Sequence, residues 1–284
     1  MSHNYQTLYA KLGTYAEVAR FCGVNESTVR RALQRKQGAA LSGVENIEVS
    51  ERILFIGDVH APAEHPDYLA FLVAVRDKYK LDTAISVGDF IDFHAMSYHE
   101  SDPDLPGPGD ELDEGAERLQ AYAAEFPKLS ITTGNHCNIP ARKALTNGLP
   151  KAFLRGYNEL FNLPDTWFWT TRPLGFTLEC GVAVAVQHAV SPSLEAGRKN
   201  LRDSALVQGH HHFTAGVAWA SAPRHQLFFL SCGCGVNPAH PAMAYADKGV
   251  LKMPCLGCGM LLNGDARFVP MWVRGNGRWN GVVP

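Results

Sequence analysis

Four short apolar runs of the chain end in residues that can bind a metal ion, and this repeated pattern constrains the fold most strongly. Amphipathic stretches with a helical period separate the runs, as in ILFIGDVH followed by a predicted helix over 68–80. Strands that alternate with helices predict a layered α/β fold. Because open α/β sheets build their sites at strand ends, we expect the polar ends of the runs to meet in one cleft.

The side chains at or near the ends of apolar runs that can bind a metal ion are carboxylates, an amide and imidazoles. They are Asp58, His60, Asp89, Asp92, Asn135, His136, His188, His210, His211 and His212. Since residues i and i+2 of an extended segment face the same way, Asp58 with His60, and His210 with His212, should each point a pair into the cleft. His211 would then face away, in a supporting or outward role. Carboxylate and imidazole ligands together favour manganese, with iron, zinc, cobalt or nickel as alternatives, over a hard-oxygen calcium site.

A single Gly-Asp or Gly-Asn pair is ordinary turn chemistry and predicts only a loop. The order of the motifs is more informative: Asp-x-His, Gly-Asp-x-x-Asp, Gly-Asn-His, an isolated His and Gly-His-x-His, each after an apolar run. With this order, the sequence resembles the calcineurin-like metallophosphoesterase family from Arg52 to His212. The resemblance implies an α/β fold in which a sandwich of two mixed β-sheets is flanked by helices, with metals at the strand ends.

The resemblance also implies a dinuclear metal centre. Its pattern assigns one ion to Asp58, His60, Asp89 and His212, and the other to Asp89, Asn135, His188 and His210. Asp89 would bridge the two ions. Two neighbouring cations can acidify a shared water to give a hydroxide, polarise phosphoryl oxygens and stabilise the charge that develops on phosphorus. The implied activity is that of a metal-dependent phosphoric ester hydrolase.

Two further residues are expected to act in catalysis. By the resemblance, His136 stands beside the metals and donates a proton to the leaving oxygen or a hydrogen bond to the phosphoryl group. Asp92 would accept from the other nitrogen of that ring and hold its tautomer. The usual acid after Gly-Asn-His is Cys137 here, so either Asp92 becomes more important or His136 less effective. His94 and His99, in the loop after Asp92, either contact the substrate phosphate or face solvent.

The beginning of the chain has a different pattern. Residues 4–36 predict three short helices, and Gly23 and Asn25 between the last two can end one helix and cap the next. Residues 1–36 resemble a helix-turn-helix domain of the bacterial and phage type. Residues 37–50 are small and polar and predict a linker, which leaves residues 51–284 for the metallophosphoesterase domain.

The third predicted helix would present hydroxyl, amide and guanidinium groups outward. These side chains are Ser27, Thr28, Arg30, Arg31, Gln34 and Arg35. Such groups contact the phosphates and base edges of DNA, so we expect DNA as a partner. A packing or assembly module with a solvated basic face is the alternative, because helix-turn-helix units also dock proteins.

Four late cysteines form two close pairs. They are Cys232, Cys234, Cys255 and Cys258. A structural zinc site is one interpretation of such spacing. Both pairs lie beside apolar, strand-like residues, where buried thiols are common, and this second interpretation is the favoured one.

Composition bounds the remaining classes of function. The chain has 284 residues, 46% of them hydrophobic, and 26 basic against 28 acidic side chains, so any affinity for polyanions must be local. No apolar run approaches the roughly 20 residues of a membrane span, and the start lacks the apolar stretch of a secretory signal. Seven Cys, an odd number, suit a reducing compartment better than a disulfide framework. We therefore expect a cytoplasmic protein without membrane contact, in the host cytoplasm if a phage encodes it.

The leading hypothesis is a dinuclear phosphodiesterase or nuclease that the helix-turn-helix segment brings to DNA. One alternative is a phosphomonoesterase or a hydrolase of small nucleotides whose N-terminal helices serve assembly. Another is a DNA-binding regulatory protein with a weakened phosphoesterase domain, for which Cys137 is the only support.

Overall fold

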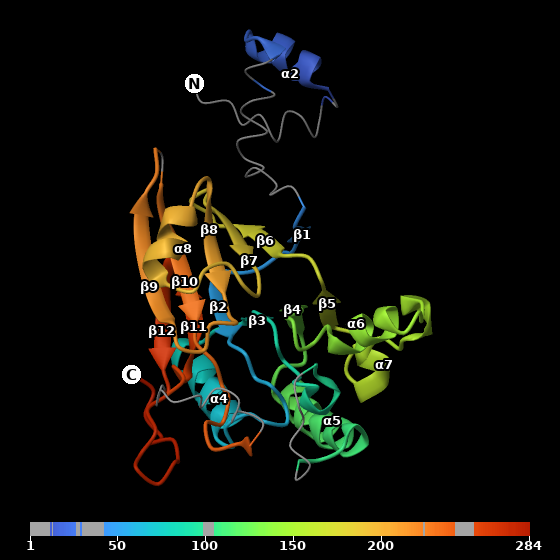
Figure 1. Ribbon diagram of the computed structural model, residues 1–284. Coiled ribbons are helices and arrows are strands. Elements are labelled where there is room, and N and C mark those ends of the chain that lie inside the picture. Colours follow the sequence, from blue (N-terminus) through green and yellow to red (C-terminus); the bar gives the residue numbers. More distant parts are fainter. Residues whose placement is uncertain are drawn as a thin grey trace.

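The computed structural model of the protein describes residues 12, 14–26, 29, 43–98, 105–223, 225–241 and 253–284. Its main body is a sandwich of two six-stranded mixed sheets with helices on both sides (Figure 1). The predicted α/β fold class is therefore confirmed.

The first sheet has the strand order β1-β6-β7-β8-β10-β9. Its strands are β1 (Glu45–Asn46), β6 (Leu174–Thr177), β7 (Ala183–Val186), β8 (Ser204–Gln208), β9 (Ala215–Ser221) and β10 (Gln226–Cys232). Strands β7, β8 and β10 are parallel, whereas β6 pairs antiparallel to β7 and β9 antiparallel to β10. Strands β6 and β7 follow one another in the chain and form a hairpin.

The second sheet has the order β12-β11-β2-β3-β4-β5. Its strands are β2 (Arg52–Ile56), β3 (Thr83–Ser86), β4 (Leu129–Thr132), β5 (Trp167–Thr170), β11 (Gly257–Leu262) and β12 (Asp265–Pro270). The four strands from β2 to β5 are parallel, and β11 pairs antiparallel to both β2 and β12. The carboxyl ends of β2, β3 and β4 therefore lie at one edge of the sheet.

Alternation along β2 explains why the sandwich has two cores. Ile53 and Phe55 are fully buried in the cluster between the sheets, where β6, β7, β8 and β10 contribute the other side. Leu54 and Ile56 point the opposite way, into the cluster beneath the helices. A strand buried on both faces has no polar alternation, which matches the unbroken apolar run ILFI.

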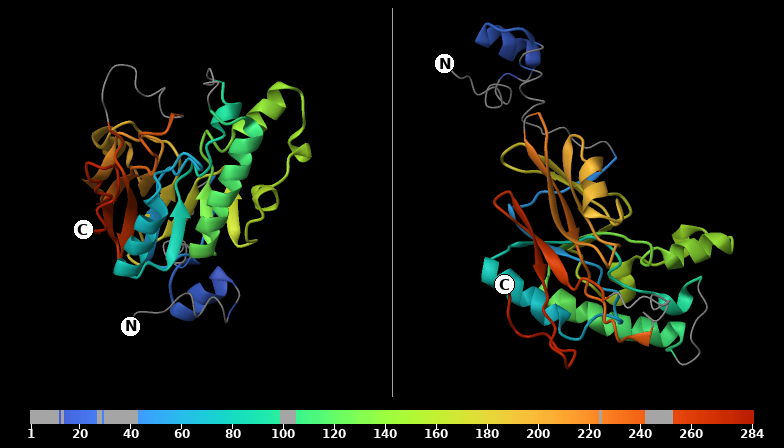
Figure 2. Two further views of the ribbon diagram at one scale, coloured as in Figure 1. Left: turned by 90° about the horizontal axis from the view of Figure 1, so that it is seen from below. Right: turned by 60° about the vertical axis from the view of Figure 1, so that its left-hand side comes forward.

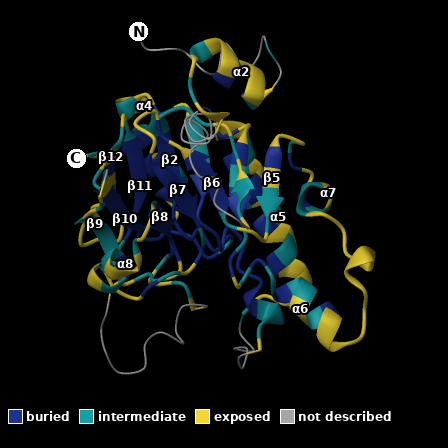
Figure 3. Ribbon diagram, turned by 90° about the horizontal axis from the view of Figure 1, so that it is seen from above, coloured by how far each residue is buried: buried dark blue, intermediate teal, exposed yellow. Residues whose placement is uncertain are grey.

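Helices cover the outer faces of both sheets (Figure 2). The second sheet packs against α4 (Tyr68–Tyr79) and α5 (Pro108–Glu125), and the first against α8 (Leu194–Asn200). Buried strands alternate with helices whose outward faces are exposed (Figure 3). No helix among these described elements is long and apolar enough to cross a membrane.

Shorter elements follow strands β3 and β4. They are η1 (His94–Met96), α6 (Ile139–Thr146), η2 (Lys151–Phe153) and α7 (Tyr157–Phe161). Helix α6 is separated from η2 because Gly148 takes a left-handed φ of 73° and Pro150 follows. Helix α5 begins at Pro108, with Asp110 and Glu111 in its first turn. Pro at the first helical position and acids near the amino end both favour that start.

Part of the predicted linker belongs to the sandwich. Glu45 and Asn46 pair in parallel with Leu174 and Gly175 as edge strand β1. Short polar residues gave no strand signal here, because an edge strand of two residues draws its stability from backbone pairing. The boundary of a separate N-terminal domain remains a prediction.

The described N-terminal residues agree with the predicted turn. Helix α2 (Tyr15–Cys22) begins at Thr14, whose side chain accepts from the Glu17 amide, and ends at Gly23 with a φ of 67°. Val18 and Val29 form a small buried cluster, as expected for helices that pack across this turn. The remainder of the first and third predicted helices lies outside the described residues.

Candidate metal centre

Five loops bring all seven predicted ligands together at one edge of the sandwich. The loops follow β2, β3, β4, β7 and β8, which are parallel within their sheets. Within this edge, three groups of side chains have ligand atoms that lie within 4.8 Å of one another. The groups are Asp58, His60 and His212; Asp89, His188 and His210; and His60, Asp92 and His136.

The route by which the side chains reach the cleft differs from the one expected. Strand β2 ends at Ile56 and β8 at Gln208, so the ligands stand beyond the strands. His60, Asp89 and His210 take left-handed φ values of 57°, 39° and 66°. The i, i+2 argument from an extended segment was therefore wrong, because tight turns aim these residues. Such conformations are costly for non-glycine residues and concentrate at functional sites.

In the first ligand group, Asp58 is the central residue. Its Oδ2 lies 3.1 Å from His212 Nε2 and accepts the backbone amide of His210 at 2.7 Å. Asp58 is fully buried and His60 almost so. One carboxylate and two imidazoles thus share a small, water-poor volume.

In the second group, the Nε2 atom of His188 lies close to two oxygen atoms and one nitrogen atom. This atom lies 2.9 Å from Asp89 Oδ2, 3.0 Å from Asn135 Oδ1 and 3.1 Å from His210 Nδ1. On the other side of the ring, Nδ1 lies 3.1 Å from the Val87 carbonyl, which can accept its proton. The four residues expected to share an ion are therefore brought together.

Asp89 lies between the two groups. Its Oδ2 is 2.9 Å from His188 Nε2 in one group and 3.9 Å from His60 Nε2 in the other. Its Oδ1 accepts the His136 amide at 2.7 Å, which fixes the orientation of the carboxylate. A single oxygen is thus placed where it can face both groups.

Several buried polar atoms of the centre lack a protein partner. Within the described residues, Asp58 Oδ1, His60 Nε2 and Asp92 Oδ2 are buried and make no hydrogen bond. Leaving such atoms unsatisfied is costly in a folded protein. A divalent cation would satisfy the first two, and mixed carboxylate and imidazole donors match the preference of first-row transition metals. The first group therefore fits a metal ion by its unsatisfied atoms and by its donor chemistry, and the second group fits one by its donor chemistry.

Asp92 holds two imidazoles at once. Its Oδ1 lies 2.8 Å from His60 Nδ1 and 2.6 Å from His136 Nδ1. The contact with His136 was expected, whereas the contact with His60 was missed. The position of Asp92, three residues after Asp89, was the signal in the sequence that could have indicated it. Carboxylates that accept from a ligand imidazole fix its tautomer and strengthen it as a ligand.

Cys137 leaves the orientation of His136 to Asp92. The thiol is fully buried, and burial raises its pKa to about 12. Its amide points to Asp89 Oδ1 at 3.4 Å, and its carbonyl accepts from the Tyr157 hydroxyl. The residue therefore packs the loop and carries no charge toward the centre.

The electrostatics of the centre follow from this packing. Burial opposes ionisation of Asp89, but the charge and hydrogen bond of His188 and the charge of His60 lower its pKa well below the usual range. Burial also opposes ionisation of Asp92, but the charges of His60 and His136 and their hydrogen bonds lower its pKa. Burial also opposes the charged form of His136, yet its hydrogen bond with Asp92 and the charge of Asp89 raise its pKa to about 9. The site is thus built around negative charge that attracts cations.

Glycines let the loops approach the ligands. A Cβ on Gly134 would stand 2.1 Å from Asp89 Oδ1, and one on Gly209 would stand 2.1 Å from Asp58 Oδ1. These contacts are far below van der Waals distance. The glycine before each of these two motifs is therefore required by space.

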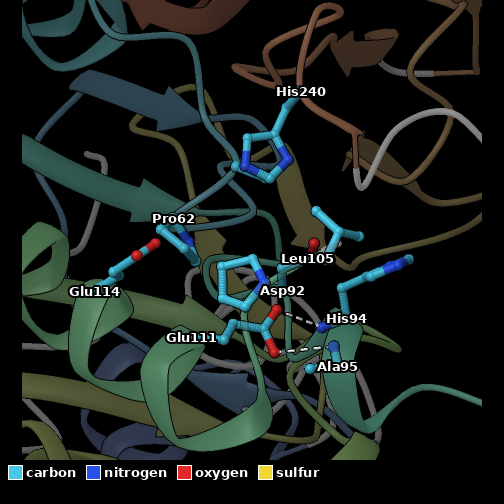
Figure 4. Close-up of a pocket in the computed structure, with 10 residues that line it drawn as sticks. Pro62, Asp92, His94, Ala95, Leu105, Glu111, Glu114 and His240 are labelled. Atoms are coloured by element: carbon cyan, nitrogen blue, oxygen red, sulfur yellow. Dashed lines mark hydrogen bonds between the residues drawn. The ribbon is translucent and has the colours of Figure 1, made fainter. Parts of the chain in front are cut away.

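A small pocket adjoins Asp92 (Figure 4). His94, expected to contact substrate or face solvent, is buried on its wall, and His240 stands on the opposite side. Glu111 accepts the amides of His94 and Ala95 at 2.6 and 2.9 Å and so holds η1 in place. His99 lies outside the described residues.

His211 belongs to none of the ligand groups found in the described part of the chain. It is half-buried, and its ring packs 4.8 Å from that of His210. This placement agrees with the supporting role expected for it.

The late cysteines do not gather as a zinc site. None of the ligand groups among the described residues contains a cysteine. Cys232 belongs to the core between the sheets, whereas Cys234 and Cys258 belong to the core beneath the helices. Because strand geometry directs the sulfurs to different cores, the zinc interpretation is wrong, and these three thiols are buried core residues. Cys255 is partly exposed.

The six side chains expected to contact DNA cannot be placed. Ser27, Thr28, Arg30, Arg31, Gln34 and Arg35 lie outside the described residues. Their role remains a prediction from the sequence.

Comparison with known proteins finds one family model and several solved structures that are similar to this chain. The family model described as calcineurin-like phosphoesterase matches residues 51–226. Similar solved structures include Yfce, a phosphoesterase from E. coli, with 15% identity, a TM-score of 0.39 and coverage of 80% of this chain and 96% of that chain. Vacuolar Protein Sorting 29 from Cryptosporidium parvum has 16% identity, a TM-score of 0.40 and coverage of 80% and 93%. The nuclease MPE from Pseudomonas putida has 15% identity, a TM-score of 0.32 and coverage of 76% and 86%.

A search of curated proteins found no match. The family model alone spans more than half of the 284 residues and ends after the last predicted ligand. The chain therefore belongs to the calcineurin-like phosphoesterase family.

Proposed function

We propose that the protein is a phosphodiesterase that hydrolyses DNA at a dinuclear metal centre. The observation that carries the metal-dependent hydrolysis is the position of Asp89 Oδ2, which lies 2.9 Å from His188 and 3.9 Å from His60. A carboxylate that faces two ligand groups is the arrangement that two metal ions in one phosphoesterase site need. The preference for DNA rests on the sequence of the N-terminal segment.

Seven residues would hold the ions. Asp58, His60 and His212 would hold one, Asn135, His188 and His210 the other, and Asp89 both. When bound, the ions supply positive charge that polarises the phosphoryl group and acidifies water. Manganese is the favoured metal on ligand chemistry.

The remaining side chains orient and transfer protons. Asp92 accepts from Nδ1 of both His60 and His136. Because Nδ1 of His136 is engaged, Nε2 is the ring atom left to donate to the leaving oxygen or to a phosphoryl oxygen. The side chain of His136 is 15% exposed, so a substrate can reach it at the mouth of the site.

The contact between Asp92 and His136 argues against a weakened, purely regulatory domain. That alternative rested on Cys137 in place of the usual acid. Asp92 Oδ1 lies 2.6 Å from His136 Nδ1, so a carboxylate orients the ring despite the substitution. The protein thus retains each group that the proposed chemistry uses.

A substrate panel tests the proposal. The metal-loaded protein would be assayed with bis-nitrophenyl phosphate, nitrophenyl phosphate, cyclic nucleotides, and single- and double-stranded DNA. We expect hydrolysis of the diester and of DNA, and its loss when the metal is removed. Hydrolysis of the monoester alone would support a phosphomonoesterase instead, and cleavage of cyclic nucleotides without DNA would support a small-nucleotide hydrolase.

A further inference from the structure

The segment that follows the Gly-Asn-His loop carries an unusual local charge. Between residues 137 and 158 it contains no Asp or Glu but four basic residues, Arg142, Lys143, Lys151 and Arg155. The whole chain, by contrast, has a net charge of -2. We call residues 139–156, which comprise α6, η2 and their connections, the basic arm.

The basic arm is held at its root and exposed beyond it. Ile139 and Ala144 anchor α6 in the interior, whereas every residue from 145 to 156 is exposed. Phe153 is 76% exposed and Leu145 55%. The arm projects from the side of the sandwich near β4 and β5 (Figure 1). Large apolar side chains exposed beside cations indicate a binding surface.

The arm begins at the mouth of the metal centre. The Ile139 amide donates to the His136 carbonyl at 2.9 Å, so α6 starts directly beyond the proposed proton donor. Tyr98, from the loop after Asp92, lies across the arm with its ring 4.2 Å from Lys143 Nζ and 5.1 Å from Arg142. Tyr98 is 50% exposed. An aromatic and cationic surface therefore continues outward from the site.

We propose that the basic arm binds the single-stranded nucleic acid that extends from the scissile phosphate. Its cations would contact phosphates and release counterions, and the exposed rings of Tyr98 and Phe153 would stack on unpaired bases. Because the four cations are spread along the arm from Arg142 to Arg155, it suits a strand with several phosphates. The inference rests on the proposed function, and it names the form of nucleic acid and where it lies.

Direct binding measurements test the arm separately from catalysis. The full chain, kept metal-free with a chelator so that nothing is cleaved, would be titrated with a labelled single-stranded oligonucleotide. Lys151→Glu with Arg155→Glu should weaken binding by about tenfold or more and flatten the salt dependence, at about 0.7 in slope per lost phosphate contact. Phe153→Ser should weaken binding by about tenfold through lost stacking, with little change of that slope.

A matched control uses cations at the opposite edge. Lys128 precedes β4 and Arg202 precedes β8, both exposed, whereas the metal ligands follow these strands. Lys128→Glu with Arg202→Glu makes the same charge change and should leave affinity nearly intact. Melting temperatures of all variants would show that they fold.

Each outcome bears on one proposal. If the arm and control variants bind the oligonucleotide with equal affinity and equal salt slope, the proposal that the arm binds nucleic acid is wrong. Loss of binding to phosphatidylglycerol vesicles, with unchanged oligonucleotide affinity, would also overturn it in favour of an anionic lipid surface. If the Lys151→Glu, Arg155→Glu variant loses oligonucleotide binding while the wild type cleaves no diester, the binding role of the arm is supported and the proposed function is refuted.

Discussion

Space around single atoms determines whether the metal ligands can assemble. Gly134→Ala would place a methyl group 2.1 Å from Asp89 Oδ1, so the carboxylate that faces both groups must move. We expect metal content and diester hydrolysis to fall together while the fold is retained. Gly156→Ala, where a Cβ meets nothing within 4 Å, is the control and should keep both. Metal analysis and circular dichroism of the two variants check this, and a fully loaded Gly134→Ala protein would refute it.

His136 should affect turnover and not metal binding. It forms a group with His60 and Asp92. The other two groups consist only of proposed metal ligands and do not include it. His136→Ala should keep the metal and slow turnover by about 100-fold or more. The loss should be smaller for nitrophenyl esters than for alkyl esters, because a good leaving group needs no proton. Equal losses for both ester types would exclude the general-acid role.

Asp92 should differ from His136, because it also orients His60. Removing the charge of a carboxylate behind a ligand imidazole lowers metal affinity about 10- to 100-fold. Asp92→Asn should therefore weaken metal binding as well as slow turnover, and metal titration of both variants separates the two effects.

At the level of elements, a partly buried ion pair ties the loop after β2 to α5. The Glu64 side chain is fully buried and pairs with Arg118, which is 37% exposed. Burial raises the pKa of Glu64, although Arg118 opposes the shift. Arg118→Ala leaves this carboxyl buried without its partner, so we expect a loss on the order of 2 kcal/mol in the free energy of unfolding at neutral pH, below the ~3–5 kcal/mol of a fully buried pair.

The pH dependence of that loss has a definite sign. Without Arg118, the folded-state pKa of Glu64 rises further above its unfolded value, so the penalty is present above that pKa and disappears as falling pH protonates the carboxyl. Urea unfolding at neutral and mildly acidic pH should show the two proteins converging. Arg198→Ala, which breaks the exposed pair with Glu195, should cost almost nothing. A loss that grows on acidification would contradict the ion-pair account.

These elements also show what sequence can predict. The ligand motifs were recognisable because each follows an apolar strand, and Gly23 carried a local turn signal. By contrast, β1 and the Glu64–Arg118 pair depend on residues far apart in the chain. The double role of Asp92 likewise needs three loops at once. Local patterns therefore predicted which residues form the site, and tertiary packing determined how they are held.

For the whole molecule, the N-terminal segment is predicted to add DNA affinity without touching the chemistry. Arg30, Arg31 and Arg35 lie outside the described residues, so the prediction rests on sequence. Changing all three to Ala should weaken binding to double-stranded DNA and flatten its salt dependence, because fewer counterions are released. Hydrolysis of a small diester should stay the same. Unchanged affinity and salt dependence would indicate an assembly module instead.

The central claim is that two metal ions share Asp89, whose Oδ2 faces both ligand groups. The most direct measurement is the metal content of the wild type and of Asp89→Asn after saturation with manganese and removal of free metal. We expect about two equivalents in the wild type and depleted binding at both sites in the variant, because the substitution removes negative charge that both ions need. A variant that retains both equivalents and its activity would contradict the account.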